Sequence, residues 1–356
     1  MFDTLSWRWV ALATTLLLSG CSSLDYYSHL ASGQLQLLKA REPIAELLER
    51  PTVEPSLKQR LALAQRARDF ASAHLGLPDN QSYRLYADIQ RPYVVWNVFA
   101  TEEFSLAPKL HCFPIAGCVA YRGYYSQSRA RGAAALLKQQ GLDTYLAGIE
   151  AYSTLGWFDD PILNSMLRWN DERLAAVIFH ELAHQQLYVT DDTAFNESFA
   201  SFVEREGLRQ WRAKQGLPPN DALGDAQREQ FVALVLASRA RLQQLYDSDL
   251  TPAQMRSGKQ TEFARLRAEY RTLQAREWNG AGLYDNWINA PLNNAKLLPF
   301  GLYDRWVPAF AAVFAQAGHD WPHFYQRVAV LGQLPSAQRH KALTELSADT
   351  QNLPRQ

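Results

Sequence analysis

The chain of 356 residues has little of three features that mark specialised classes of protein. It has only 3 cysteines, its 36 basic residues are balanced by 36 acidic ones, and it has no low-complexity tract or internal repeat. The balanced charge excludes the basic footprint of a nucleic-acid-binding protein, and the missing repeats exclude a solenoid. What the chain has is 47% apolar and 12% aromatic residues, enough to bury the core of one or two domains.

The first 20 residues have the pattern of a secretory signal peptide. One basic residue, Arg8, precedes an apolar run from Val10 to Leu18. A spanning helix needs about 20 apolar residues, so this shorter run is typical of a signal peptide. We therefore expect residues 1–20 to be removed.

The segment Leu18-Ser19-Gly20-Cys21 that follows resembles the lipobox of bacterial lipoproteins. The resemblance implies that the Cys21 thiol carries a lipid and that residues 21–29 form a tether. Ser22, in place of Asp, implies an outer-membrane protein that faces the periplasm. The alternative is an ordinary secretory signal with an incidental cysteine.

The two remaining cysteines, Cys112 and Cys118, predict a disulfide in an oxidising compartment. The five residues between them include Pro114 and Gly117, which suit a turn that brings the cysteines together. Metal binding together with His111 is the alternative, although this spacing is not that of a zinc ribbon.

Residues 30–356 read as one α+β domain, mainly helical, with a small sheet region over about 82–155 and a helical part over about 156–335. β-Branched and aromatic residues indicate the sheet region, and Asp160-Pro161 is typical of a helix start. Residues 280–304 are expected to be irregular. We expect two strands between residues 82 and 104, the second over 93–104, and further strands at 119–124 and 144–154. We expect helices at 30–49 (broken at Pro43), 56–75, 128–140, 171–188, 195–214, 225–246, 252–278, 306–316 and 321–331.

The strongest chemical signal is the HExxH motif His180-Glu181-Leu182-Ala183-His184. On a helix, residues four apart share one face, so both imidazoles can bind one Zn²⁺. Glu181 would then stand beside the metal-bound water as general base. Apolar neighbours such as Ile178 predict that this helix is buried. As part of the expected fold, the small sheet region packs on this helix.

Zinc needs a third protein ligand, and the next expected helix carries Glu197, Glu204 and Glu206. The segments HELAHQ and NESFASFVE resemble the active site of the aminopeptidase N family. The resemblance implies zinc binding by His180, His184 and Glu197. Glu204, two helical turns beyond Glu197, is the alternative ligand, a supporting residue or a carboxylate at the edge of the core.

Two further residues are candidates for the reaction. Ala147-Gly148-Ile149-Glu150 is similar to the GAMEN strand of the same family, which implies that Glu150 binds the substrate's amino group; a solvent-facing glutamate on an edge strand is the alternative. Tyr303 is favoured as the donor that stabilises the oxyanion. Other candidates for that donor are Tyr284, Asn293, Asn294, His319 and His323.

Over most of residues 24–330, the chain resembles a family of predicted zinc aminopeptidases that are lipoproteins of Gram-negative bacteria. The shared segments include GQLQLL, NAPLNNAKL and VPAF. The resemblance implies a gluzincin-like fold, one Zn²⁺ per chain and a peptide substrate. A zinc endopeptidase of the periplasm and a non-catalytic lipoprotein that retains the fold are the alternatives.

Overall fold

The computed structural model describes residues 24–113, 117–151, 153–218 and 222–351. Over these residues the protein is mainly helical with small sheets of two or three strands, which confirms the expected α+β class. The predicted signal peptide and Cys21 lie outside the described residues. None of the helices in the described part of the chain is both long and apolar enough to cross a membrane.

The helices occupy most of the chain, and the strands are short. A first helix covers residues 24–39. The other helices are α2 Ile44–Glu49, α3 Pro55–Leu75, α4 Gln127–Gln139, α5 Asp171–Gln186, α6 Thr193–Lys214, α7 Ala222–Tyr246, α8 Pro252–Glu277, α9 Asp285–Asn289, α10 Asn294–Tyr303, α11 Val307–Gln316, α12 Trp321–Gln333 and α13 Ser336–Gln351. The strands are β1 Arg41–Pro43, β2 Leu85–Ala87, β3 Val95–Thr101, β4 His111–Phe113, β5 Gly117–Val119, β6 Tyr121–Tyr124, β7 Asp143–Ile149 and β8 Ile162–Leu163.

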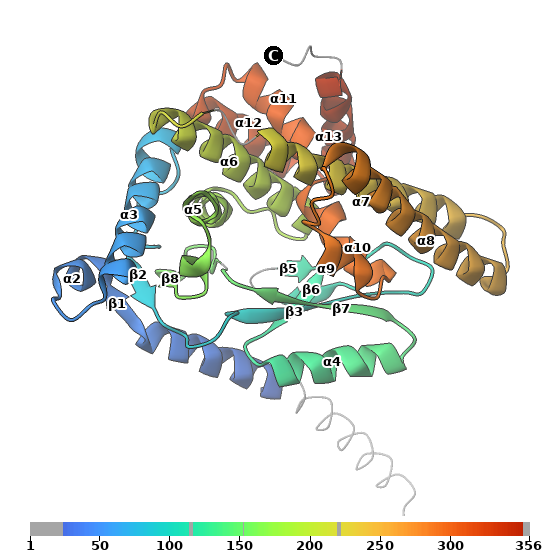
Figure 1. Cartoon of the computed structure of the whole chain (residues 1–356), viewed down its shortest axis with the longest axis horizontal. Helices are drawn as coiled ribbons and strands as arrows, with labels where there is room; N and C mark the ends of the chain where they lie inside the picture. Colours follow the sequence, from blue (N-terminus) through green and yellow to red (C-terminus); the bar gives the residue numbers. More distant parts are fainter. Residues whose placement is uncertain (1–23, 114–116, 152, 219–221, 352–356) are drawn as a thin grey trace, which may run out of the picture.

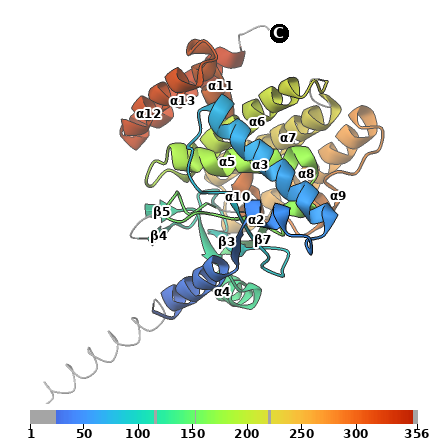
Figure 2. The same ribbon diagram turned by 90° about the vertical axis from the view of Figure 1, so that its left-hand side faces the viewer.

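The antiparallel sheet β6-β3-β7 separates two groups of helices (Figure 1). On one side lie helix 24–39 and α4, which are close together in Figure 2 and joined by an ion pair between Asp25 and Arg129. On the other side, Leu298 and Leu302 of α10 pack against Phe99 of β3. The sheet therefore lies between a pair of outer helices and the main helical body.

Helices α5 and α6 form the centre of the helical body and pack against each other. The side chains of Asn170 and Asp192 cap their N-termini, each accepting a backbone N–H three residues on. Gly207 of α6 permits a close approach to the end of α3, because a Cβ on Gly207 would lie 2.7 Å from the Leu75 side chain. Asn196 bonds both the N–H and the carbonyl of Val189 at 2.8 Å, which fixes the short connection between α5 and α6.

The N-terminal segment differs from the expected tether. Residues 24–29 are already helical and packed on the sheet. Tyr26 is buried and donates a hydrogen bond of 3.0 Å to the carbonyl of Gly123, while His29 Nε2 accepts the N–H of Tyr125. These tertiary contacts order residues that the sequence pattern leaves unassigned.

Strand pairing also extends beyond the expected range of 82–155, because β1 and β8 both pair with β2. Asp160-Pro161 begins no helix; it leads into β8, and the Asp160 carboxylate accepts the N–H and the hydroxyl of Thr154 at 2.8 Å. Ile162 and Leu163 are fully buried in this pairing. A contact between distant segments has overridden a local capping signal.

Three helices were missed in the C-terminal half. The region expected to be irregular contains α9 and α10, and α13 follows the last expected element. Asn293 caps α10 by accepting the N–H of Lys296, but Pro299 inside the helix hides its pattern.

Candidate metal centre

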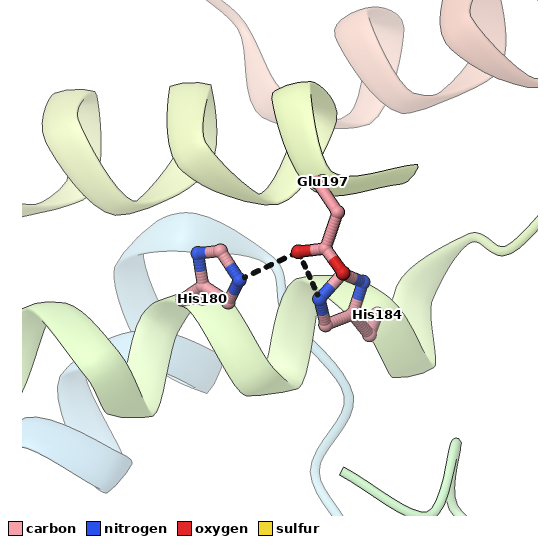
Figure 3. Close-up of side chains that lie close together, drawn as sticks. All are labelled: His180, His184 and Glu197. Atoms are coloured by element: carbon pink, nitrogen blue, oxygen red, sulfur yellow. Dashed lines mark ion pairs between the residues drawn. The ribbon is translucent and has the colours of Figure 1, made fainter. Parts of the chain in front are cut away.

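Three predicted ligands converge between α5 and α6 (Figure 3). His180 and His184 lie on one face of α5, and Glu197 reaches them from the first turns of α6. Glu197 Oε2 is 3.5 Å from Nε2 of each histidine. The ligand atoms all lie within 4.8 Å of one another, and all three residues are buried. This group could hold a metal ion.

The charges of this group depend on one another. Burial opposes the charged form of His180, but hydrogen bonds to Glu197 and Glu204 raise its pKa to about 10. Burial likewise opposes ionisation of Glu197, yet the two neighbouring imidazoles lower its pKa to about 2. The carboxylate is thus ionised and requires a positive partner, which can be a proton on histidine or a metal ion.

Glu204 supports the site from the next turns of α6. Its Oε2 lies 2.9 Å from Nδ1 of His180, on the ring nitrogen opposite the one that faces Glu197. A carboxylate in this position fixes the tautomer and orientation of a metal-binding histidine. Within the described chain, Nδ1 of His184 has no such partner. Glu204 therefore contacts only His180, whereas Glu197 faces both imidazoles and is the carboxylate of the group that could hold a metal ion.

Glu181 is buried beside this group with an exposed fraction of 8%. Burial raises its pKa, although the neighbouring histidines lower it in part. A raised carboxyl pKa brings a general base closer to neutral pH. Asp160, a residue that sequence reasoning did not connect with the site, is close enough to interact with Glu181, and burial raises the pKa of Asp160 to about 7.

Tyrosines surround the centre. The Tyr303 ring stacks against that of His180, with centroids 6.1 Å apart. Burial and the charge of Glu197 hold the pKa of Tyr303 well above its usual value, so the hydroxyl remains a donor. The pKa of Tyr121, on β6, is likewise raised by burial and by the charges of Glu197 and Glu181. The sequence pattern marked Tyr121 only as part of a strand.

Glu150 directly follows β7, and its side chain lies beside the first turn of α5. Its carboxylate accepts the indole N–H of Trp169 at 2.8 Å and a guanidinium N–H of Arg173 at 3.2 Å. Arg173 is seven residues before His180, about 10 Å along the helix. The structure therefore does not bring Glu150 into the metal-ligand group, and its charge already has partners.

The other predicted positions have structural surroundings. Cys112 and Cys118 form a disulfide between β4 and β5. Tyr284 stacks on Phe231 with centroids 3.8 Å apart, in a separate core cluster. Asn294 accepts the Tyr246 hydroxyl and donates to backbone carbonyls. Among the alternative oxyanion donors, His319 and His323 are exposed.

Fold and site together define a mainly helical α+β protein with a buried His-His-Glu group suited to a metal ion. The chain belongs to a family described as "Putative aminopeptidase", whose model matches residues 25–343. No curated protein and no solved structure shows significant similarity to this chain.

Proposed function

We propose that this protein is a zinc-dependent aminopeptidase in which His180, His184 and Glu197 hold one Zn²⁺. The observation that carries the proposal is the convergence of these three buried side chains with Glu181 beside them. Two imidazoles and a carboxylate are a donor set of catalytic zinc sites, which keep the fourth position open. A structural zinc site would have four protein ligands and no need of Glu181.

Zinc, when bound, would polarise the scissile carbonyl and lower the pKa of water. Glu181 takes a proton from the attacking water and delivers it to the leaving amine nitrogen. The carbon–nitrogen bond breaks, and the products are a carboxylate and an amine. Tyr303 and Tyr121, which both retain their protons, are the candidate donors to the developing oxyanion.

One observation favours a second candidate, a zinc endopeptidase. An aminopeptidase needs a group that binds the substrate's free amine, and the carboxylate proposed for this, Glu150, is already bound by Trp169 and Arg173. The family favours the aminopeptidase. Three kinds of substrate distinguish the two activities: peptides with a free N-terminus, peptides with an acetylated N-terminus, and peptides whose scissile bond is internal.

The deciding experiment combines metal analysis of the purified protein with such a peptide panel. We expect about one zinc per chain and hydrolysis that stops when the N-terminus is acetylated. Cleavage of acetylated, internally quenched peptides would replace the aminopeptidase by the endopeptidase. A protein with no metal and no activity on any peptide would overturn both and support a non-catalytic lipoprotein.

We also propose that a lipid on Cys21 anchors the protein in the outer membrane, facing the periplasm. The support is the lipobox-like segment and its position just before the folded helix at residue 24. Multiple acyl chains hold a protein firmly, since each buried CH₂ contributes about 0.8 kcal/mol. Cys21→Ser should move the protein from the membrane fraction to the soluble periplasm; retention in the membrane would contradict the anchor.

A further inference from the structure

A cavity of about 620 Å³ lies outside the metal-ligand group. It is enclosed by α7, α10, the start of α6 and the segment 106–110 after β3, and we call it the α7–α10 cavity. Its size is that of a small-molecule site. Its apolar lining, which we call the leucine wall, consists of Leu106, Leu110, Leu236, Leu298 and Leu302.

Two arginines line the same cavity, Arg239 of α7 and Arg305 just after α10. Within the described chain, neither guanidinium forms an ion pair: Arg239 donates to the carbonyl of Leu297 at 2.9 Å, and Arg305 lies over the Trp306 ring at 4.3 Å. Burial and, to a smaller extent, the charge of Arg305 lower the pKa of Arg239 to about 10. Each guanidinium keeps N–H groups for another partner.

Neighbouring arginines show how unusual this is. Arg241, two residues from Arg239 on α7, is paired with Glu262 and Glu269. Arg205 and Arg228 both pair with Asp304. Because a partly buried charge without a counter-ion costs free energy, two unpaired guanidiniums on one cavity indicate that an anion is the missing partner.

The acidic residues of the cavity already have hydrogen-bond partners. Asp192 caps α6 and accepts hydrogen bonds of 2.8 Å from Arg339 and His340. Burial lowers the pKa of Arg305, and the charge of Asp192 offsets only part of this effect. Asp191 accepts the backbone N–H of Cys118. The cavity therefore retains its two cationic donors.

Gly301 positions one of these donors. A Cβ at Gly301 would lie 2.5 Å from Nη2 and 2.8 Å from Cζ of Arg239. The missing side chain lets the guanidinium lie against α10, where it can reach the Leu297 carbonyl. An alanine at this position would displace the guanidinium without changing any charge.

We propose that the α7–α10 cavity binds an organic carboxylate carried on an apolar body. The carboxylate lies between Arg239 and Arg305, because the planar guanidinium matches its two oxygens, and the apolar body covers the leucine wall. The C-terminus of a short apolar peptide and a fatty acid share this chemistry. Ala120 and Leu302 of the cavity wall directly precede Tyr121 and Tyr303 of the metal centre.

The test is calorimetric binding to the purified, metal-loaded full chain. The probes are N-acetyl-Leu-Leu with a free C-terminus, its C-terminal amide, decanoate and decanol. Acetylation prevents aminopeptidase cleavage, so the result does not depend on the proposed reaction. We expect one acid to bind at least tenfold more tightly than its neutral analogue, and the tighter of the two acids identifies the source.

Variants assign this binding to the cavity. Arg239→Gln keeps a donor for Leu297, and Gly301→Ala keeps both charges; each should weaken binding at least tenfold with an unchanged melting temperature. Arg271→Gln, which changes an exposed arginine on α8, should have no effect. Binding must also persist after chelation, since a carboxylate could bind zinc directly. Equal affinity for acid and neutral probes, binding unaffected by both cavity variants, or binding lost on chelation would overturn the proposal.

Discussion

Helix α5 contacts a glutamate near each of its ends, and the two glutamates differ in what surrounds them. Glu150, near the first turn, is bound by Trp169 and Arg173, and its side chain is 25% exposed. Glu197, near the last turns, is 8% exposed and lies 3.5 Å from two imidazole nitrogens. Both were expected to act on a substrate or metal, and both are carboxylates beside the same helix.

The difference lies in the chemistry of the partners. Arginine carries a permanent charge, so the charge of Glu150 is compensated within the protein. Histidine can be neutral, and a buried carboxylate beside two neutral imidazoles needs a cation. A carboxylate surrounded by histidines is therefore a ligand candidate, and one surrounded by arginines is a structural one.

Removing one of the proposed metal ligands should have the largest effect on metal content and activity. His184→Ala or Glu197→Gln should reduce bound metal from about one ion per chain to a trace, and peptide hydrolysis with it, because two ligands do not hold zinc. Glu206→Gln, which changes an α6 carboxylate paired with Arg209, is the matched control. Metal analysis by mass spectrometry checks this. Full occupancy in His184→Ala would rule out the site.

Removing the base should separate chemistry from binding. Glu181→Gln preserves shape and ligands but cannot accept a proton from water, so turnover should fall by at least about 10²-fold with metal content unchanged. Steady-state kinetics on the best peptide measure the effect. Near wild-type turnover in this variant would show that another residue is the base.

Weakening the support of His180 should have an intermediate effect. Glu204→Gln removes the negative charge that faces Nδ1 of His180 and should lower metal affinity by about 10–100-fold. Competition with a chelator gives the affinity. If Glu204→Gln lost metal as completely as Glu197→Gln, the two carboxylates would have to exchange roles.

The smallest effect is expected at the other end of α5. Glu150→Gln should leave metal content unchanged and reduce the free energy of unfolding by no more than about 1 kcal/mol, since Arg173 is exposed and the pair is screened by solvent. Denaturant unfolding and metal analysis provide the measurements. A large rise in KM confined to peptides with a free N-terminus would instead make Glu150 the amine-binding residue and erase the contrast with Glu197.

Much of the helical body could be predicted from the sequence, because helix signals are local. The expected helices at 171–188 and 252–278 match α5 and α8 within two residues, and Thr251 starts α8 with a local capping box that includes Gln254. The strands β1 and β8 were missed because each is two or three residues long and exists only through pairing with β2. α10 was missed because Pro299 interrupts its pattern.

The sequence by itself determined that His180 and His184 share one face of a helix with Glu181 between them, since the geometry of a helix fixes the spacing of residues four apart. Only the tertiary structure decided which carboxylate completes the group, because Asn196 sets the connection that brings Glu197 over both imidazoles and leaves Glu204 behind His180. The tertiary structure also decided which residues bind Glu150 and that Tyr121 lies near Glu197 and Glu181. It likewise placed Arg239 and Arg305 in the lining of one cavity. These contacts join segments far apart in the chain, and packing rather than local spacing determines them.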